Sequence, residues 1–128
     1  MEERIRQEFI EILKRLLSDL HNKKYEDIVK YVETSDDLDL MDDLKNDLEE
    51  TLEDYGYEAI AEYGTLIEEE DKIARLDIYE FNDGTGFSID YILSADQELT
   101  DFVLQLDFVY TNKSPKGIRC VFGDIDYR

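Results

Sequence analysis

The spacing of apolar residues changes once along this chain, and that change constrains its fold more than any other feature. Up to Tyr55 the apolar residues recur at three- and four-residue steps, which is the period of one helix face. From Ile73 they alternate with polar residues, which is the period of a strand. We therefore expect an α+β fold, with helices over about residues 2–56 and a sheet over about residues 73–127. At 128 residues the chain is long enough to bury a core, and we expect residues 1–128 to form a single domain.

Two helices are predicted before residue 33. The first carries an apolar stripe from Ile5 to Leu20, and it ends where Asn22 can adopt the left-handed conformation. The second is shorter, begins near Tyr25 and has Val32 as the last residue of its apolar face.

A third and longer helix is predicted to begin at Thr34, whose hydroxyl can cap free amide groups, and to end at Gly56. Acidic residues occupy its other faces, and like charges four residues apart each cost roughly 0.2–0.5 kcal/mol. A face that weakens its own helix indicates that the charge has a use. The apolar stripe of this helix consists of Leu38, Met41, Leu44, Leu48, Leu52 and Tyr55.

About four strands are predicted, and short loops should join them into a curved antiparallel meander with helices on one face. They span Ile73–Phe81, Phe87–Leu93, Phe102–Tyr110 and Ile118–Tyr127, with a hairpin turn at Asn82–Gly86. Alternation places two sets of residues each on one face of its strand, namely Phe87, Ile89, Tyr91 and Leu93, and Phe102, Leu104, Leu106, Phe108 and Tyr110.

The net charge of −20 is concentrated in one segment. Seventeen acidic residues and a single base, Lys45, lie between Glu33 and Asp71, whereas residues 1–32 are neutral overall. A surface of this sign repels phosphate groups, which disfavours direct binding to nucleic acid or to an anionic membrane. The composition therefore favours a basic protein as the partner.

Several features favour a cytoplasmic location. Cys120 is the only cysteine, so an intrachain disulfide is excluded. The N-terminus lacks the apolar stretch of a signal peptide, and charges interrupt every apolar run before it reaches membrane-spanning length.

The sequence offers no catalytic constellation. His21 lies at the predicted end of the first helix, where a cation complements the helix dipole. Cys120 occupies a core position in the last strand, beside Phe122, which is typical of a buried structural thiol. We therefore predict a protein that is not an enzyme.

Carboxylates alone do not define a metal site here. With Gly84 as the glycine of an EF-hand loop, Tyr79 and Phe81 would occupy ligand positions, so that motif fails. Asp77, Asp90 and Asp107 could meet on one sheet face for acid–base chemistry, although alternation with solvent is the favoured interpretation. No metal or cofactor is expected.

The segments Phe87–Asp90, Leu93-Ser94 and Glu98–Leu104 resemble a small bacterial family of uncharacterised proteins. Proteins of that kind often occur beside toxin or contact-inhibition systems as immunity proteins. The order of helices followed by a long antiparallel sheet also resembles the cystatin-like and nuclear-transport-factor-2-like (NTF2-like) folds. The first resemblance implies an immunity role and the second implies only a fold. Neither transfers catalytic residues, because a fold of this type hosts enzymes, binders and adaptors alike.

The resulting hypothesis is a non-enzymatic, acidic protein-binding domain, an immunity protein that neutralises a basic toxin such as a nuclease. One alternative is a DNA-mimic inhibitor of a nucleic-acid enzyme, and another is a small-ligand binder or enzyme that uses the concave sheet face. The oligomeric state stays open. The residues predicted to bind the partner are Asp39, Asp42, Asp43, Asp47, Glu49, Glu50, Glu53, Asp54, Tyr55, Tyr57 and Tyr63.

Overall fold

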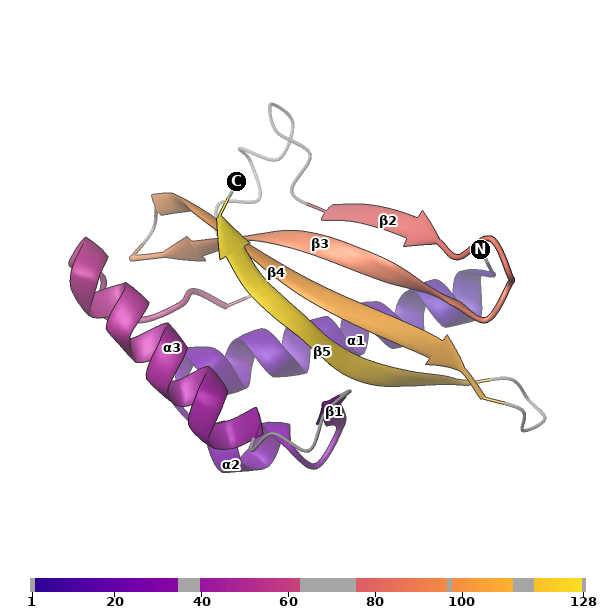
Figure 1. The fold of residues 1–128 in the computed structure, drawn as a ribbon, viewed down its shortest axis with the longest axis horizontal. Helices are drawn as coiled ribbons and strands as arrows, with labels where there is room; N and C mark the ends of the chain where they lie inside the picture. Colours follow the sequence, from indigo (N-terminus) through magenta and orange to yellow (C-terminus); the bar gives the residue numbers. More distant parts are fainter. Residues whose placement is uncertain (1, 35–39, 63–75, 97, 112–116, 128) are drawn as a thin grey trace.

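The chain folds into a five-stranded sheet with its N-terminal helix across one face (Figure 1). A computed structural model describes residues 2–34, 40–62, 76–96, 98–111 and 117–127. The predicted α+β class is confirmed. The elements in chain order are α1 (Glu3–His21), α2 (Tyr25–Ile28), β1 (Val32–Thr34), α3 (Leu40–Tyr55), β2 (Leu76–Glu80), β3 (Gly86–Ala95), β4 (Glu98–Tyr110) and β5 (Ile118–Tyr127).

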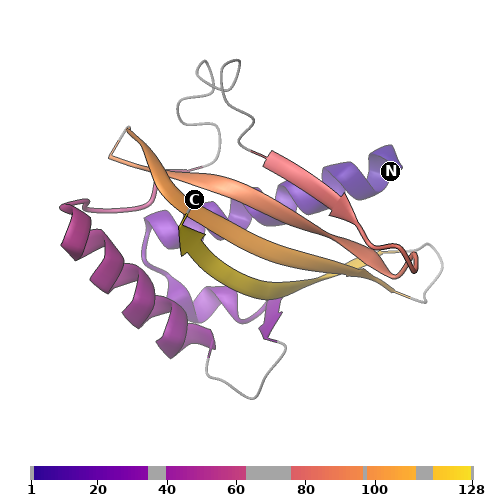
Figure 2. The ribbon, with the colours of Figure 1, turned by 45° about the horizontal axis from the view of Figure 1, so that its top comes forward.

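The last four strands form the predicted antiparallel meander, and the strand order across the sheet is β1-β5-β4-β3-β2. The long strands β4 and β5 twist and bend as they cross α1, so the sheet is curved (Figures 1 and 2). A register shift between Gln105 and Leu106 interrupts the β4–β5 pairing and adds to the bend.

The strand β1 corrects two predictions. Val32 does not end a helix and Thr34 does not begin one, because both lie in β1, which pairs in parallel with residues 120–122 of β5. The sheet is therefore mixed and has one strand more than predicted. Val32 is buried, but the contact that buries it is with a strand almost ninety residues away in sequence, at Cys120. Val32 follows the buried Ile28 by four residues, so its burial in the sheet coincides with the spacing expected of one helix face.

The helices begin and end close to, but not always at, the predicted residues. Helix α2 has only four residues, so the predicted helix stops well before Val32, and Val29, the next residue after α2, is 48% exposed. Helix α1 ends as predicted near Asn22, but Lys23 adopts the left-handed conformation, with φ of 57°. Asn22 instead donates a side-chain hydrogen bond to the Ser18 carbonyl.

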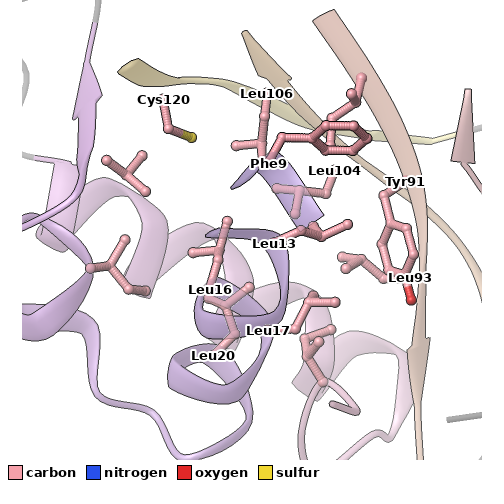
Figure 3. Close-up of a cluster of buried hydrophobic side chains, with 14 of the residues drawn as sticks. Phe9, Leu13, Leu16, Leu17, Leu20, Tyr91, Leu93, Leu104, Leu106 and Cys120 are labelled. Carbon is pink, nitrogen blue, oxygen red and sulfur yellow. The ribbon is translucent and has the colours of Figure 1, made fainter. Parts of the chain in front are cut away.

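Helix α1 lies lengthwise across the sheet and provides one wall of the core (Figure 3). The ring of Phe9 packs edge-on against Phe87, with centroids 5.5 Å apart, and Phe87 stacks on Phe108 of the next strand. The predicted alternation is confirmed, because the side chains on the helix-facing side of β3 and β4 are buried: Phe87, Ile89, Tyr91, Leu93, Phe102, Leu104, Leu106 and Phe108.

Several predicted features fall outside the described residues: the apolar residue Leu38, the partner-binding residues Asp39 and Tyr63, and the first residues of the strand expected from Ile73. Among the described helices, none is both long enough and apolar enough to cross a lipid bilayer.

Candidate protein-interaction surface

Helix α3 carries most of the predicted partner-binding residues, and its orientation is set by its apolar face. Leu48 and Leu52 are 1% and 4% exposed and join the core. Because a helix turns 100° per residue, Asp47, Glu50 and Asp54 lie together on the opposite side, and all three are exposed. We call these three residues the outward stripe.

The charges on α3 are not neutralised within the described part of the chain. No salt bridge there involves the outward stripe, Glu49 or Glu53. The last turn of α3 contains acids and no base, although the negative end of a helix dipole favours cations. Both features disfavour the isolated helix, and both would be relieved by a basic partner.

Gly56 ends α3 as predicted and turns the chain back along the helix. Its φ of 74° is in the left-handed region that glycine adopts at low cost. The Gly56 N–H donates to the Glu53 carbonyl at 3.2 Å, and the Tyr57 N–H donates to the Leu52 carbonyl at 2.9 Å. This pair of bonds is a Schellman motif, which holds Tyr57 beside the last turn of α3.

The segment after Gly56 is held by contacts from two other elements. The Asp96 carboxylate accepts from the Glu58 N–H at 2.9 Å and from the Ala59 N–H at 3.4 Å. The Ala61 N–H donates to the Ser94 carbonyl at 2.8 Å. These bonds fix residues 58–61 against the hairpin that joins β3 to β4.

His21 connects the end of α1 to the same segment. Its Nδ1 lies 2.9 Å from the Ile60 carbonyl oxygen, and its Nε2 lies 3.8 Å from a carboxylate oxygen of Glu62. The sequence predicted a residue that complements the helix dipole. The structure adds a positioning contact that bridges two segments 39 residues apart.

A groove opens where α3, the α1–α2 turn and the segment after Gly56 meet. Its volume is about 720 Å³. Leu52 and Ala59 supply apolar surface, Tyr57 is half-buried, and three carboxylates contrast with one ammonium group. The groove is lined by Lys23, Glu49, Leu52, Glu53, Tyr57, Glu58 and Ala59.

Two of the predicted aromatic anchors pack on one core ring. Tyr55 is 54% exposed and meets Phe102 edge-on, with centroids 5.0 Å apart. Tyr57 meets the same ring at 6.4 Å. Tyr55 therefore has surface available to a partner while it rests on the core, and Tyr57 lines the groove.

The structure divides the predicted partner-binding residues into groups. Asp47, Glu50 and Asp54 form the outward stripe, and Tyr55 lies on the core side of α3 at its last residue. Glu49, Glu53 and Tyr57 line the groove. Asp42 and Asp43 lie on α3 with side chains outside the described set, and Asp39 and Tyr63 fall outside the described residues altogether.

The groove residues Lys23, Leu52, Glu58 and Ala59 were not predicted as site residues. Glu58 lies in the acidic segment, and its position just after the Gly56 stop was the available signal. Lys23 had no such signal, because only the tertiary fold brings the α1–α2 turn beside α3.

The other candidate residues occupy separate places. Cys120 is buried, as predicted, and burial raises the pKa of its thiol to about 12, with smaller contributions from Asp107 and Glu33. A thiol with that pKa carries almost no thiolate at neutral pH.

The strand aspartates lie on the sheet face that points away from the helices, in agreement with the favoured interpretation. Asp77 and Asp90 are direct neighbours across β2 and β3, whereas Asp107 lies opposite Ser88. Partial burial, and then the charge of Asp77, raise the pKa of the Asp90 carboxyl. Within the described residues, no three histidine, cysteine or carboxylate side chains are grouped in a way that could hold a metal ion.

The fold and this surface define a class: an α+β domain whose third helix presents exposed carboxylates beside a groove. The chain belongs to the family described as Domain of unknown function (DUF7668), which matches residues 17–127. The matched range includes every residue that lines the groove. No curated protein and no solved structure matches the chain.

Proposed function

We propose that this protein is a non-enzymatic binding domain that captures a basic protein partner in the cytoplasm, and that the partner is a toxin domain such as a nuclease. The observation that carries the proposal is the outward stripe. Asp47, Glu50 and Asp54 are exposed on α3, and none of them forms a salt bridge within the described residues. Such a surface is complementary to clustered lysine and arginine side chains.

Inhibition follows from the chemistry of the target. A nuclease presents basic residues to its phosphate substrate, so a carboxylate surface that binds those residues excludes the nucleic acid. Charge complementarity accelerates association, and an aromatic anchor at the interface slows dissociation. Tyr55 is suited to the anchoring role, because its ring is held edge-on against Phe102 while about half of the residue is exposed.

The resemblance of residues 87–104 to small bacterial proteins found beside toxin systems supports an immunity role. The long helix packed across a curved meander supports a cystatin-like or NTF2-like relationship, which is part of the same proposal. Both folds host binding proteins as well as enzymes, so the surface, not the fold, carries the functional argument.

The small-ligand alternative is weakened by the packing of the core. The helix-facing side of the sheet is occupied by side chains of α1, among them Phe9, Leu13 and Leu16, which are at most 1% exposed (Figure 3). A DNA-mimic inhibitor relies on the same carboxylates as an immunity protein, so the identity of the partner distinguishes these two.

The test uses the full chain as bait in extracts of its source cell, followed by calorimetry with the purified partner. We expect a basic protein whose affinity falls at least about 10-fold between low and high salt. Asp47→Lys, Glu50→Lys and Asp54→Lys together should weaken binding by at least about 100-fold.

The control makes the same change in charge elsewhere: Glu3→Lys, Glu11→Lys and Glu26→Lys, all at exposed positions on α1 and α2. This control should change the affinity less than about 3-fold, since only long-range attraction is altered. If both triple variants bind equally well, or if the captured partner is not basic, the proposal is wrong. A nuclease inhibited at equimolar protein supports immunity, whereas an intracellular DNA-processing enzyme supports the DNA-mimic alternative.

A further inference from the structure

Hydrogen bonds within the chain position one side of the groove. The Schellman motif holds Tyr57 against the end of α3, and Asp96 holds the backbone of Glu58 and Ala59. His21 fixes Ile60 from the opposite side. A site built in this way loses little conformational freedom on binding, so its contacts contribute to affinity more fully.

The lining combines two kinds of surface in one place. Ala59 and the Tyr57 ring, both half-buried, offer apolar and aromatic contact, and the buried Leu52 adds only a small apolar area. Glu49, Glu53 and Glu58 bring three negative charges, and Lys23 brings one positive charge, so the groove is net negative. An apolar ligand would cover the carboxylates without offering them a hydrogen-bond donor or a positive charge. A small inorganic cation would leave the apolar surface uncovered.

An arginine side chain matches both kinds of surface. Its aliphatic stem packs on apolar residues, and its guanidinium stacks on aromatic rings. Its planar fork of N–H groups can also donate two parallel hydrogen bonds to one carboxylate, a geometry that a lysine ammonium does not offer. Glu49 and Glu53 are four residues apart on α3, so their Cβ atoms are about 5–6 Å apart, within reach of one guanidinium.

We propose that this groove binds a short extended segment of the partner that inserts an arginine between Glu49 and Glu53, with its stem over Tyr57 and Ala59. A volume of about 720 Å³ exceeds one side chain and accommodates the neighbouring residues of such a segment. Lys23 donates to backbone carbonyl oxygens of the segment. The inference rests on the proposed function, because it assigns to the acidic surface a specific recognition site separate from the outward stripe.

The probe is a capped pentapeptide, acetyl-Gly-Leu-Arg-Leu-Gly-amide, titrated into the full chain and followed by backbone amide NMR. We expect saturable shifts at Lys23, at residues 49–53 and at residues 57–59. Replacing the arginine with citrulline, which has the same shape but no charge, should weaken binding at least about 10-fold. Replacing it with lysine should weaken binding about 3-fold or more.

Matched variants separate the groove from general attraction. Glu49→Gln with Glu53→Gln should weaken peptide binding at least about 5-fold, whereas Asp47→Asn with Glu50→Gln removes the same charge and should change it less than about 2-fold. Lys23→Gln should leave the citrulline preference intact. Equal effects of the two double variants, equal binding of the citrulline peptide, or shifts confined to residues outside the groove would each overturn the inference.

Peptide binding to the groove and partner binding to the outward stripe are measured separately, so either proposal can fail without the other. If the outward-stripe reversal abolishes partner binding but the arginine peptide does not bind the groove, only the groove inference fails. If the peptide binds as expected but the outward-stripe reversal leaves partner binding intact, the proposed function fails in its place.

Discussion

A single residue, Asp96, holds one wall of the groove through its side-chain carboxylate. It accepts hydrogen bonds from two consecutive backbone N–H groups, those of Glu58 and Ala59. Asp96 itself has φ of 49°, a conformation that aspartate and asparagine tolerate better than most residues. Asp96 therefore tolerates the backbone conformation of its own turn and also holds residues 58 and 59 in place.

Asp96→Ala should lower the free energy of unfolding by about 1–2 kcal/mol, because two backbone donors lose their acceptor and alanine is disfavoured at positive φ. Asp96→Asn keeps one acceptor oxygen and the conformational tolerance, so its loss should be under about 1 kcal/mol. Urea denaturation measures both, with exposed Glu26→Gln as the control. Equal stability of the wild-type and alanine proteins would show that Asp96 does not hold the segment.

Asp90 illustrates the opposite case, in which a residue works against the fold. It faces Asp77 across β2 and β3, and its carboxyl pKa is raised by partial burial and by that neighbour. A raised pKa means that the folded state prefers the protonated form. The contribution to stability is therefore full below the ordinary pKa of about 3.9 and falls as pH rises through the folded-state pKa.

Asp90→Asn should consequently stabilise the protein at pH 7 by roughly 0.2–1 kcal/mol, since it removes a like-charge pair directly across two strands. The gain should disappear at pH 3, because the Asp90 carboxyl, whose pKa is raised, is then protonated and no longer repels Asp77. Asp107→Asn is the matched control, because Asp107 lies on the same face opposite Ser88 and Val121 and not opposite an acid. Urea denaturation at the two pH values measures the change in the free energy of unfolding. A gain that persists at pH 3 would show that repulsion between Asp90 and Asp77 is not its cause.

At the scale of elements, the close approach of β3 and β4 depends on a missing side chain. A Cβ atom at Gly86 would lie 2.1 Å from the carbonyl oxygen of Phe108 and 3.1 Å from the Cα of Val109. Both are backbone atoms of the paired strand, so they cannot move aside as a flexible side chain would. Gly86 thus permits the pairing that places Phe87 and Phe108 in contact under Phe9.

Gly86→Ala should lower the free energy of unfolding by about 1–3 kcal/mol, because the two strands must separate locally to admit the methyl group. Ser88→Ala, two residues along the same strand on the outward face, should change it by less than about 0.5 kcal/mol. Thermal unfolding followed by circular dichroism compares the two. Similar midpoints for both variants would mean that the strand pairing relaxes without cost.

At the scale of the whole molecule, self-repulsion dominates the electrostatics. With a net charge of −20, compaction brings like charges together, and α3 places them without compensating bases in its last turn. Dissolved salt screens these interactions over roughly 10 Å at 0.1 M. The fold should therefore be more stable at high ionic strength.

Raising NaCl from about 20 mM to about 500 mM should raise the midpoint of thermal unfolding by several degrees. A variant with Asp47→Asn, Glu50→Gln and Asp54→Asn should show a smaller rise, because part of the repulsion has been removed. Differential scanning calorimetry measures both curves. A midpoint that falls with salt would indicate that attractive ion pairs, such as Arg119–Glu33, matter more than repulsion.

The sequence by itself determined the features that depend on neighbours a few residues apart. The stripe on α1, the alternation in β3 and β4 and the stop at Gly56 were predictable, because helix period, strand period and glycine conformation are local properties. The acidic faces of α3 were predictable for the same reason, since three- and four-residue spacing determines which side chains share a face.

Only the tertiary structure decided how distant segments meet. Val32 has the spacing of a helical residue, yet it lies in a parallel strand because β5 provides a partner that no local pattern reveals. The sequence identified Glu49 and Glu53 as acidic residues of one helix. The groove beside them exists because Asp96 and His21 hold residues 58–60 alongside α3, close to Lys23. Long-range hydrogen bonds of this kind carry no periodic signature, so the acidic helix could be predicted and the groove beside it could not.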